Sequence, residues 1–189
     1  MTLPNGENEV GFSRSQYPGI NKVAVYSEQL LIDYRWYVAN KVTPAFAFGH
    51  GLSYTSFSYS NLTIYSSNST STSTSTSTST SSSTPLLPIQ ISVTIANTGK
   101  RSGAEIAQLY VVFPQLARAA PLQLRGFVKT EVIQPGDSVS LEFVLHRRRD
   151  LVVWDDMKTH DWVTVPGVYE VHVGASSQDI RLSGQINIE

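Results

Sequence analysis

The chain has 189 residues, 41% of them hydrophobic and 15% charged, and a formal net charge of −1 at pH 7. This size and composition fit one globular domain with an additional segment, and the small net charge argues against binding to nucleic acid or to a membrane surface. The lack of cysteine excludes disulfides and cysteine-based zinc sites. No apolar run approaches the roughly 20 residues of a spanning helix, and residues 1–20 contain no apolar block typical of a signal peptide.

Residues 23–38 form an aromatic-rich segment whose periodicity fits two structures. A helix with Ser27 as its N-cap would gather the apolar side chains into one stripe. A strand would instead alternate Leu30, Ile32, Tyr34 and Trp36 with polar neighbours. In either case some 55 residues with one such element are too few to bury a core of their own. We therefore expect this part to be the end of a larger domain.

From residue 57 onward, apolar side chains recur with a period of two, as in half-buried strands. We expect strands near 57–64, 89–95, 106–113, 122–128, 139–145, 151–154, 168–174 and 180–188. The more continuous apolar run from 106 to 113 predicts a central strand covered on both faces. Seven or eight short strands, separated by turns such as Pro135-Gly136 and Pro166-Gly167, predict an antiparallel β-sandwich.

Residues 66–84 are all Ser or Thr apart from Asn68, and such a tract is predicted to be disordered because it offers no apolar surface to offset its ordering entropy. Two sequons, at Asn61 and Asn68, are candidate N-glycosylation sites. The tract would accept O-glycans in the same setting. Together these features favour a secreted or a vacuolar or lysosomal-type location.

The stretch from 44 to 55 is predicted to be an ordered joint between two packed bodies. Gly49 and Gly51 flank His50, so the backbone can adopt positive φ or approach a neighbour closely at both glycines. His50 has no His, Cys or carboxylate close to it in sequence. We therefore expect it to pack and hydrogen-bond between domains rather than to bind a ligand.

Several short motifs resemble the C-terminal region of glycoside hydrolase family 3 enzymes. Before residue 56 they are YSE at 26–28, YRWY at 34–37 and FGHGLSYT at 48–55. After it they are IANTG at 95–99, GAEIAQLYV at 103–111, LRGF at 124–127, DLVVWD at 150–155, PGVYEV at 166–171 and GASS at 174–177. The second set resembles the fibronectin type III-like (immunoglobulin-like) module that ends many of these enzymes. The family usually has glycine where Gln29 and Asp33 stand, and proline where Ala47 stands.

The resemblance implies a mainly β chain with two parts. Residues 1–55 would be the C-terminal remnant of an α/β sandwich domain plus the joint. Residues 56–189 would be the fibronectin type III-like sandwich, with 66–84 as a loop insertion, although composition alone would make that tract a linker between domains. Such enzymes are retaining β-glycosidases (β-glucosidases, β-xylosidases) that need two carboxyl groups about 5–5.5 Å apart. The resemblance places the nucleophile on a barrel that is not part of this chain, so we assign no catalytic residue, cofactor or metal and expect the chain alone to be inactive.

Other candidate sites have plainer explanations. Glu28 and Asp33 could be imagined as an acid–base pair, but an exposed face explains them as well. The acidic and histidine side chains near the second tryptophan could bind a hard cation, or they could simply form the tip of a polar hairpin; they are Asp155, Asp156, His160 and Asp161. The basic run 147–149 lies next to acids that can neutralise it.

Two functions stay open from sequence. The first is a structural module that packs against the catalytic domains of a parent glycosidase. The second is a stand-alone β-sandwich for carbohydrate binding or adhesion, in which Trp154, Trp162 and Tyr169 would form a platform for sugar rings, although core packing is the more usual place for rings on strands.

Overall fold

The computed structural model describes residues 1–6, 9, 15–16, 18–65 and 88–189. The strands of this part are β1 (Phe57–Tyr65), β2 (Ile89–Asn97), β3 (Ile106–Val112), β4 (Gln123–Lys129), β5 (Ser138–Leu145), β6 (Val153–Asp155), β7 (Asp161–Val163), β8 (Gly167–Ser176) and β9 (Asp179–Ile188). The helices are α1 (Tyr34–Asn40), α2 (Arg147–Asp150) and a 3-10 turn, η2 (Gln115–Ala117). None of these helices is long and apolar enough to span a bilayer.

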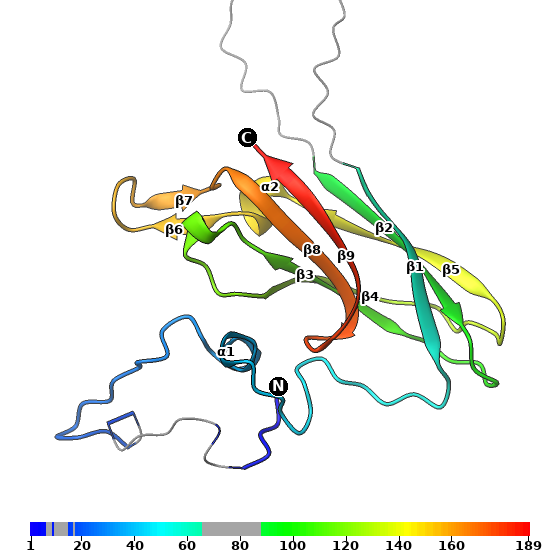
Figure 1. Ribbon diagram of the computed structural model, residues 1–189, viewed down its shortest axis with the longest axis horizontal. Coiled ribbons are helices and arrows are strands. Elements are labelled where there is room, and N and C mark those ends of the chain that lie inside the picture. The colour runs from blue at the N-terminus through cyan, green and yellow to red at the C-terminus, as the bar shows by residue number, and fades with distance from the viewer. Residues whose placement is uncertain (7–8, 10–14, 17, 66–87) are drawn as a thin grey trace, which may run out of the picture.

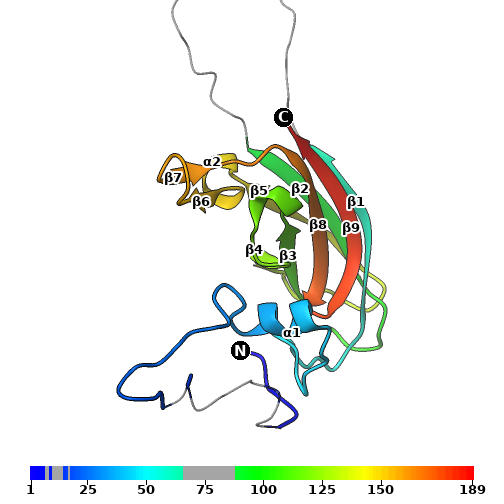
Figure 2. The same cartoon turned by 60° about the vertical axis from the view of Figure 1, so that its left-hand side comes forward.

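Two antiparallel sheets form the body of the molecule. One has the strand order β1-β2-β5 and the other the order β4-β3-β8-β9, while β6 and β7 form a separate hairpin. The two larger sheets form two layers, with α1 below them and the β6–β7 hairpin projecting to one side (Figures 1 and 2). The predicted mainly β, antiparallel sandwich is confirmed.

The main core lies between the two sheets and follows from the period-two pattern. Four alternate side chains of β2, from Ile89 to Ile95, are completely buried, and they pack against Leu109 and Val111 of β3 and Val171 of β8 within one cluster. Strand β3 is different, because five consecutive residues, 107–111, are buried. Both of its faces are therefore covered, as its continuous apolar run predicts.

Strands β1 and β2 are neighbours in one sheet. Tyr65, the last residue of β1, lies opposite Gln90, the second residue of β2. The segment that joins them thus connects two adjacent strands of one sheet. Residues 66–87 lie outside the described part of the chain, so the predicted disorder of 66–84 stays a prediction.

The ambiguous segment before the joint is helical only at its end. Helix α1 begins at Tyr34, and residues 23–33 before it form turns and irregular backbone with an isolated bridge at Val23, not a strand. Gln29 (φ 52°) and Asp33 (φ 56°) have left-handed backbone, which L-residues other than glycine seldom adopt. These are two of the positions at which the resemblance described above implies glycine, and both have a backbone conformation that glycine adopts readily.

Candidate interdomain seam and aromatic cleft

A second, smaller apolar cluster fixes α1 and the joint to the outer face of the β4-β3-β8-β9 sheet. Tyr34 of α1 stacks on Phe48 of the joint with 4.5 Å between ring centroids, and its edge faces Tyr110 of β3 at 6.1 Å. Leu122, just before β4, is buried in the same cluster. We call this contact, formed by Tyr34, Phe48, Gln108, Tyr110 and Leu122, the seam.

Gln108 ties the joint to the sheet through hydrogen bonds. Its Nε2 donates to the carbonyl of Gly49 at 2.9 Å and to that of Ala175 at 2.6 Å, while its Oε1 accepts a 2.6 Å bond from the Tyr110 hydroxyl. Burial, reinforced by the nearby Tyr34, raises the pKa of Tyr110, so this hydroxyl keeps its proton and remains a donor. Gln108 is only 5% exposed; its bond with the Tyr110 hydroxyl is buried, and its bonds to the two carbonyls are partly buried.

Two further hydrogen bonds extend the seam along the joint. The amide N–H of Leu124 donates to the Tyr34 hydroxyl at 2.9 Å, and the amide N–H of Ser177 donates to the Phe48 carbonyl at 2.9 Å. Unpaired backbone groups at a buried contact cost free energy. These bonds satisfy groups that would otherwise be left open where the joint meets the sheet.

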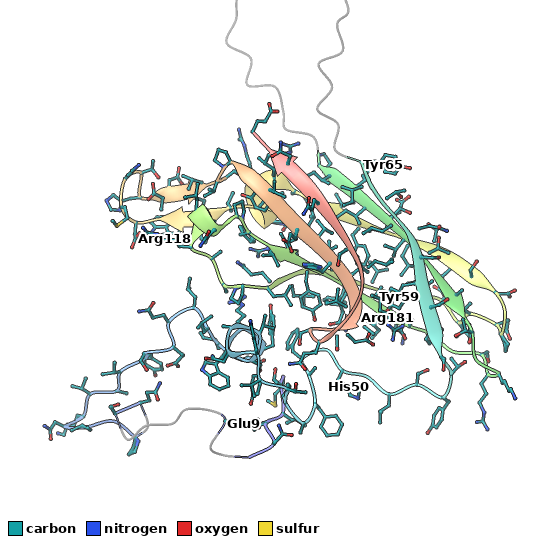
Figure 3. All side chains as sticks on the ribbon, viewed as in Figure 1. Glu9, His50, Tyr59, Tyr65, Arg118 and Arg181 are labelled. Carbon is teal, nitrogen blue, oxygen red and sulfur yellow. The ribbon has the colours of Figure 1, made fainter. Side chains whose placement is uncertain are left out.

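Only one of the two joint glycines has the special conformation that we expected. Gly49 has φ +80°, and a Cβ atom there would collide with the Gln108 side chain. Gly51, in contrast, has open space around it. His50 between them is exposed (Figure 3), and the side-chain contact that the structure shows for it is a tilted ring contact with Phe46 at 5.4 Å. The predicted interdomain hydrogen bond of His50 is not seen among the described residues.

The part of the chain before β1 carries a large exposed apolar surface. Tyr26 is 76%, Leu52 93% and Tyr54 91% exposed. This surface, which we call the N-terminal apolar surface, comprises Leu3, Ile20, Val23, Val25, Tyr26, Leu30, Ile32, Phe46, Leu52 and Tyr54. A concentration of exposed apolar side chains is typical of a surface that another protein segment covers.

The β6–β7 hairpin brings two of the predicted platform residues together. Trp154 and Trp162 lie directly opposite each other, with ring centroids 5.8 Å apart in a T-shaped arrangement. Both are more than half exposed, so the expectation that they pack in the core is wrong. They line a cleft of about 920 Å³, whose other walls include η2, Arg35 and Arg125. We call it the aromatic cleft.

Tyr169, the third predicted platform residue, lies elsewhere. It is completely buried in the main core, its ring packs against Phe113, and its hydroxyl donates to the Val165 carbonyl at 2.8 Å. It therefore has no face available to a ligand. The platform hypothesis is left with the two tryptophans alone.

Arg125 is one of the cationic residues that line the aromatic cleft. Its guanidinium lies 5.1 Å from the centre of the Phe113 ring, and its Nη2 donates to Gln123 Oε1 at 2.7 Å. Burial lowers the pKa of Arg125, yet a guanidinium stays charged in proteins. The cleft thus combines two exposed indole rings with hydrogen-bonding groups.

The remaining candidates have structural partners. Asp155 accepts bonds from the amide groups of residues 157–159 and so organises the predicted polar hairpin tip. No group of three or more possible metal ligands occurs among the described residues. Asp33 accepts a hydrogen bond from the Thr2 amide, and Glu28 accepts one from the Gln16 side chain. The hydrogen bonds that the structure shows for these two carboxylates are therefore to other residues, not to each other.

The basic run at 147–149 is partly neutralised by Asp150, the acidic residue that follows it. Asp150 accepts hydrogen bonds from the Arg149 side chain and from the His146 amide, each at 2.8 Å. Burial acts to raise the pKa of Asp150, but these bonds outweigh it and bring the pKa below its usual value. Asn61 lies exposed on β1, and Asn68 lies outside the described residues.

Comparison with known proteins agrees with this architecture. Residues 105–177 match the family described as "Fibronectin type III-like domain". The chain is 40% identical over 166 residues to the probable beta-glucosidase D of Aspergillus niger, an alignment that covers 87% of this chain and 22% of that protein. The chain corresponds to the C-terminal region of the family 3 β-glucosidases.

Solved structures of this family have the same fold in their matching parts. The beta-D-glucoside glucohydrolase of Trichoderma reesei superposes on all of this chain with a TM-score of 0.79 at 35% identity. The GH3 beta-glucosidase of Bifidobacterium adolescentis does so with a TM-score of 0.81 at 28% identity. The chain covers only 26% and 25% of these two structures. This C-terminal region is a small part of larger enzymes, and it does not contain their catalytic barrel.

The sequence motifs located the seam without revealing its chemistry. Gln108 stands within GAEIAQLYV, which marked the family, but we assigned it no role. The available signal was a single amide residue inside an otherwise apolar run, because a buried polar side chain needs hydrogen-bond partners. The partner carbonyls, of Gly49 and Ala175, are 59 and 67 residues away in sequence, and no local pattern points to them.

Proposed function

We propose that this chain is the structural, interdomain-packing module of a β-glucosidase-like family 3 hydrolase. The seam carries this proposal. It buries Tyr34 of α1, which precedes the joint, against the sandwich that follows the joint. The module therefore anchors the end of one domain on the surface of the next.

The partner of the module is the catalytic region of the parent enzyme. All residues of the N-terminal apolar surface except Leu52 and Tyr54 precede Phe48 of the seam in the chain, on the side where preceding domains of such an enzyme would pack. No acid pair suited to glycoside hydrolysis is assigned in the chain, so we expect the isolated chain not to hydrolyse aryl β-glucosides. Turnover by the purified chain would contradict this.

A chimera tests the proposal directly. The matching C-terminal part of the A. niger beta-glucosidase D is replaced by this chain, and a second chimera carries Tyr34→Ala to break the seam. We expect the first chimera to hydrolyse an aryl β-glucoside and the second to lose activity at a lower temperature. A third protein that lacks the module should fail to accumulate as active enzyme. Equal heat stability of all three would refute a structural role.

The aromatic cleft supports a second candidate function, carbohydrate binding. Sugar rings stack on exposed aromatic faces, and the volume of about 920 Å³ falls within the range of about 300–1,000 Å³ typical of small-molecule sites. The indole rings of Trp154 and Trp162 would contact the apolar faces of a neutral gluco-oligosaccharide. Gln123 and Arg125 would hydrogen-bond its hydroxyl groups.

Calorimetric titration with cello-oligosaccharides tests this candidate. We expect the full chain to bind and both Trp154→Ala and Trp162→Ala to remove binding without loss of folding. Phe127→Ala is a matched control, because Phe127 is an exposed aromatic residue of β4 that does not line the cleft. Unchanged binding in the tryptophan variants, or no binding by the full chain, would exclude the platform.

A further inference from the structure

Strand β1 is an open edge of the sandwich. In the two larger sheets the edge strands are β1, β5, β4 and β9. An edge strand presents backbone groups that can pair with another chain, and native proteins protect such edges with charges, bulges or covering segments. We therefore ask what prevents β1 from pairing with a strand of another chain.

The four edges differ in their charged residues. Strand β5 contains Glu142, β4 contains Arg125 and Lys129, and β9 contains Asp179 and Arg181. The nine residues of β1, FSYSNLTIY, include no charged residue and no proline. Among these four strands, β1 alone lacks the usual protection by charge within its own sequence.

One end of β1 is nevertheless covered. Arg181 of β9 donates from Nη1 to the Phe57 carbonyl at 2.8 Å, and its guanidinium lies 4.6 Å from the centre of the Tyr59 ring. Figure 3 shows Tyr59 and Arg181 together at this end, with Tyr65 at the opposite end of the strand. The Arg181 contact protects the beginning of the strand. In its second half the side chains of Leu62 and Ile64 lie against Gly184 of β9, but β9 is not a hydrogen-bonded neighbour of β1, so the backbone groups of this half have no strand partner on that side among the described residues.

A bulge interrupts β1 where that second half begins. Ser60 lies opposite Thr94 and Thr63 opposite Ser92, so two residues of β1, Asn61 and Leu62, face a single residue of β2. Asn61 has φ +53°, and asparagine is among the few non-glycine residues that tolerate this backbone. Asn61 on this bulge is exposed.

The sequon Asn61-Leu62-Thr63 is presented on this bulge in an accessible form. Both Asn61 and Thr63 are exposed, whereas Leu62 between them faces inward. The bond that the structure shows from Asn61 Nδ2, to Thr94 Oγ1, is long at 3.4 Å. The amide nitrogen and the hydroxyl that a glycosylating enzyme must reach are thus both available.

We propose that Asn61 carries an N-glycan and that this glycan shields the uncharged edge of β1. In the reaction Asn61 Nδ2 forms a bond to C1 of a lipid-linked oligosaccharide diphosphate. The bond from C1 to the diphosphate oxygen breaks, the lipid diphosphate leaves, and Nδ2 loses one proton. A hydrated glycan at the bulge would block a second chain from pairing along the edge beyond Ser60. The proposal places the chain in a secretory pathway, which the second sequon and the Ser/Thr tract also favour.

Secretion of the full chain from yeast behind a cleavable leader tests the modification. An Asn68→Gln background removes the other sequon, and Thr63→Ser and Thr63→Ala form a matched pair, because serine preserves the sequon and alanine destroys it. We expect peptide N-glycosidase to lower the mass of the background protein and of Thr63→Ser but not that of Thr63→Ala. Digestion in heavy-oxygen water should leave labelled aspartate at position 61. An unchanged mass for the background protein would overturn the assignment.

Aggregation tests the shielding. We expect light scattering on gentle heating to rise earlier for Thr63→Ala, and for Thr63→Ser trimmed with an endoglycosidase that leaves a single sugar on Asn61, than for fully glycosylated Thr63→Ser. The trimmed Thr63→Ser sample separates loss of the glycan from any effect of alanine on folding, and it adds no charge to β1 because residue 61 stays asparagine. Identical aggregation of the fully glycosylated and trimmed samples would refute the shielding role even if Asn61 is modified.

Discussion

Gln108→Leu would remove the three hydrogen bonds that Gln108 makes in the seam while nearly preserving its side-chain volume. The wild-type amide makes three short bonds, to the Gly49 carbonyl, the Ala175 carbonyl and the Tyr110 hydroxyl. A typical intramolecular hydrogen bond contributes about 1 kcal/mol net, so we expect a loss of about 3 kcal/mol in the free energy of unfolding. The loss is larger if the abandoned groups stay dry, because each buried unpaired group costs about 1–3 kcal/mol.

Thermal denaturation followed by circular dichroism would measure this loss. For a chain of this size, about 1 kcal/mol lowers the Tm by about 2–4 °C, so the expected shift is about 6–12 °C. Gln185→Leu is the matched control, since Gln185 is an exposed residue of β9 and the same substitution there should change the Tm little. Tyr110→Phe removes only one of the three bonds and should fall between the two. A Gln108→Leu shift no larger than that of Gln185→Leu would refute the seam as a stabilising contact.

Three further predictions concern other parts of the molecule. In urea unfolding, Asp33→Gly should be more stable than Asp33→Ala by about 1–3 kcal/mol. Both variants lose the hydrogen bond from the Thr2 amide, but only glycine adopts the positive φ of residue 33 without strain. Equal stabilities of the two variants would contradict backbone strain at this position. Replacing residues 67–87 by a short turn should shift the Tm by only a few degrees, since Tyr65 and Gln90 are already paired and each doubling of loop length costs only about 0.6 kcal/mol; loss of folding would contradict this. Hydrogen bonds from Arg181 lower the pKa of Asp179, and hydrogen bonds that outweigh burial lower the pKa of Asp150. Both carboxylates therefore stabilise the fold fully above the ordinary aspartate pKa of about 3.9, and this stabilisation should be lost as the pH falls through their lower folded-state pKa values. Asp179→Asn should accordingly flatten the acid side of a curve of Tm against pH.

The sandwich could be predicted from sequence because its signals are local. Alternation in 89–95 and 139–145, with turns at Pro135-Gly136 and Pro166-Gly167, gave strands that the structure confirms at β2, β5 and β8. The hairpin tip between the two tryptophans was likewise visible as a polar interruption. The alternation of buried and exposed side chains within a strand has a period of two, so it depends only on nearby residues and can be seen directly in the sequence.

The fate of the three platform rings could not be predicted in the same way. Trp154, Trp162 and Tyr169 all fall on strands, but only Tyr169 belongs to a strand of the two larger sheets. The tryptophans lie on a small hairpin that those sheets do not cover, so they remain exposed. Whether a ring is buried depends on which sheet a strand joins, and that is a property of the tertiary fold.

The seam changes where the stable unit of this chain begins. Strand β3 has buried residues on both faces, and a strand of that composition needs cover on both sides. The main core covers one face, whereas Tyr34 and Phe48, which precede β1, cover Tyr110 on the other. A sandwich cut at residue 55 would expose this apolar face and leave the Gln108 amide without its Gly49 partner. The energetic unit therefore includes α1, and any domain attached before α1 is held to the sandwich through a helix that the sandwich itself needs for its own stability.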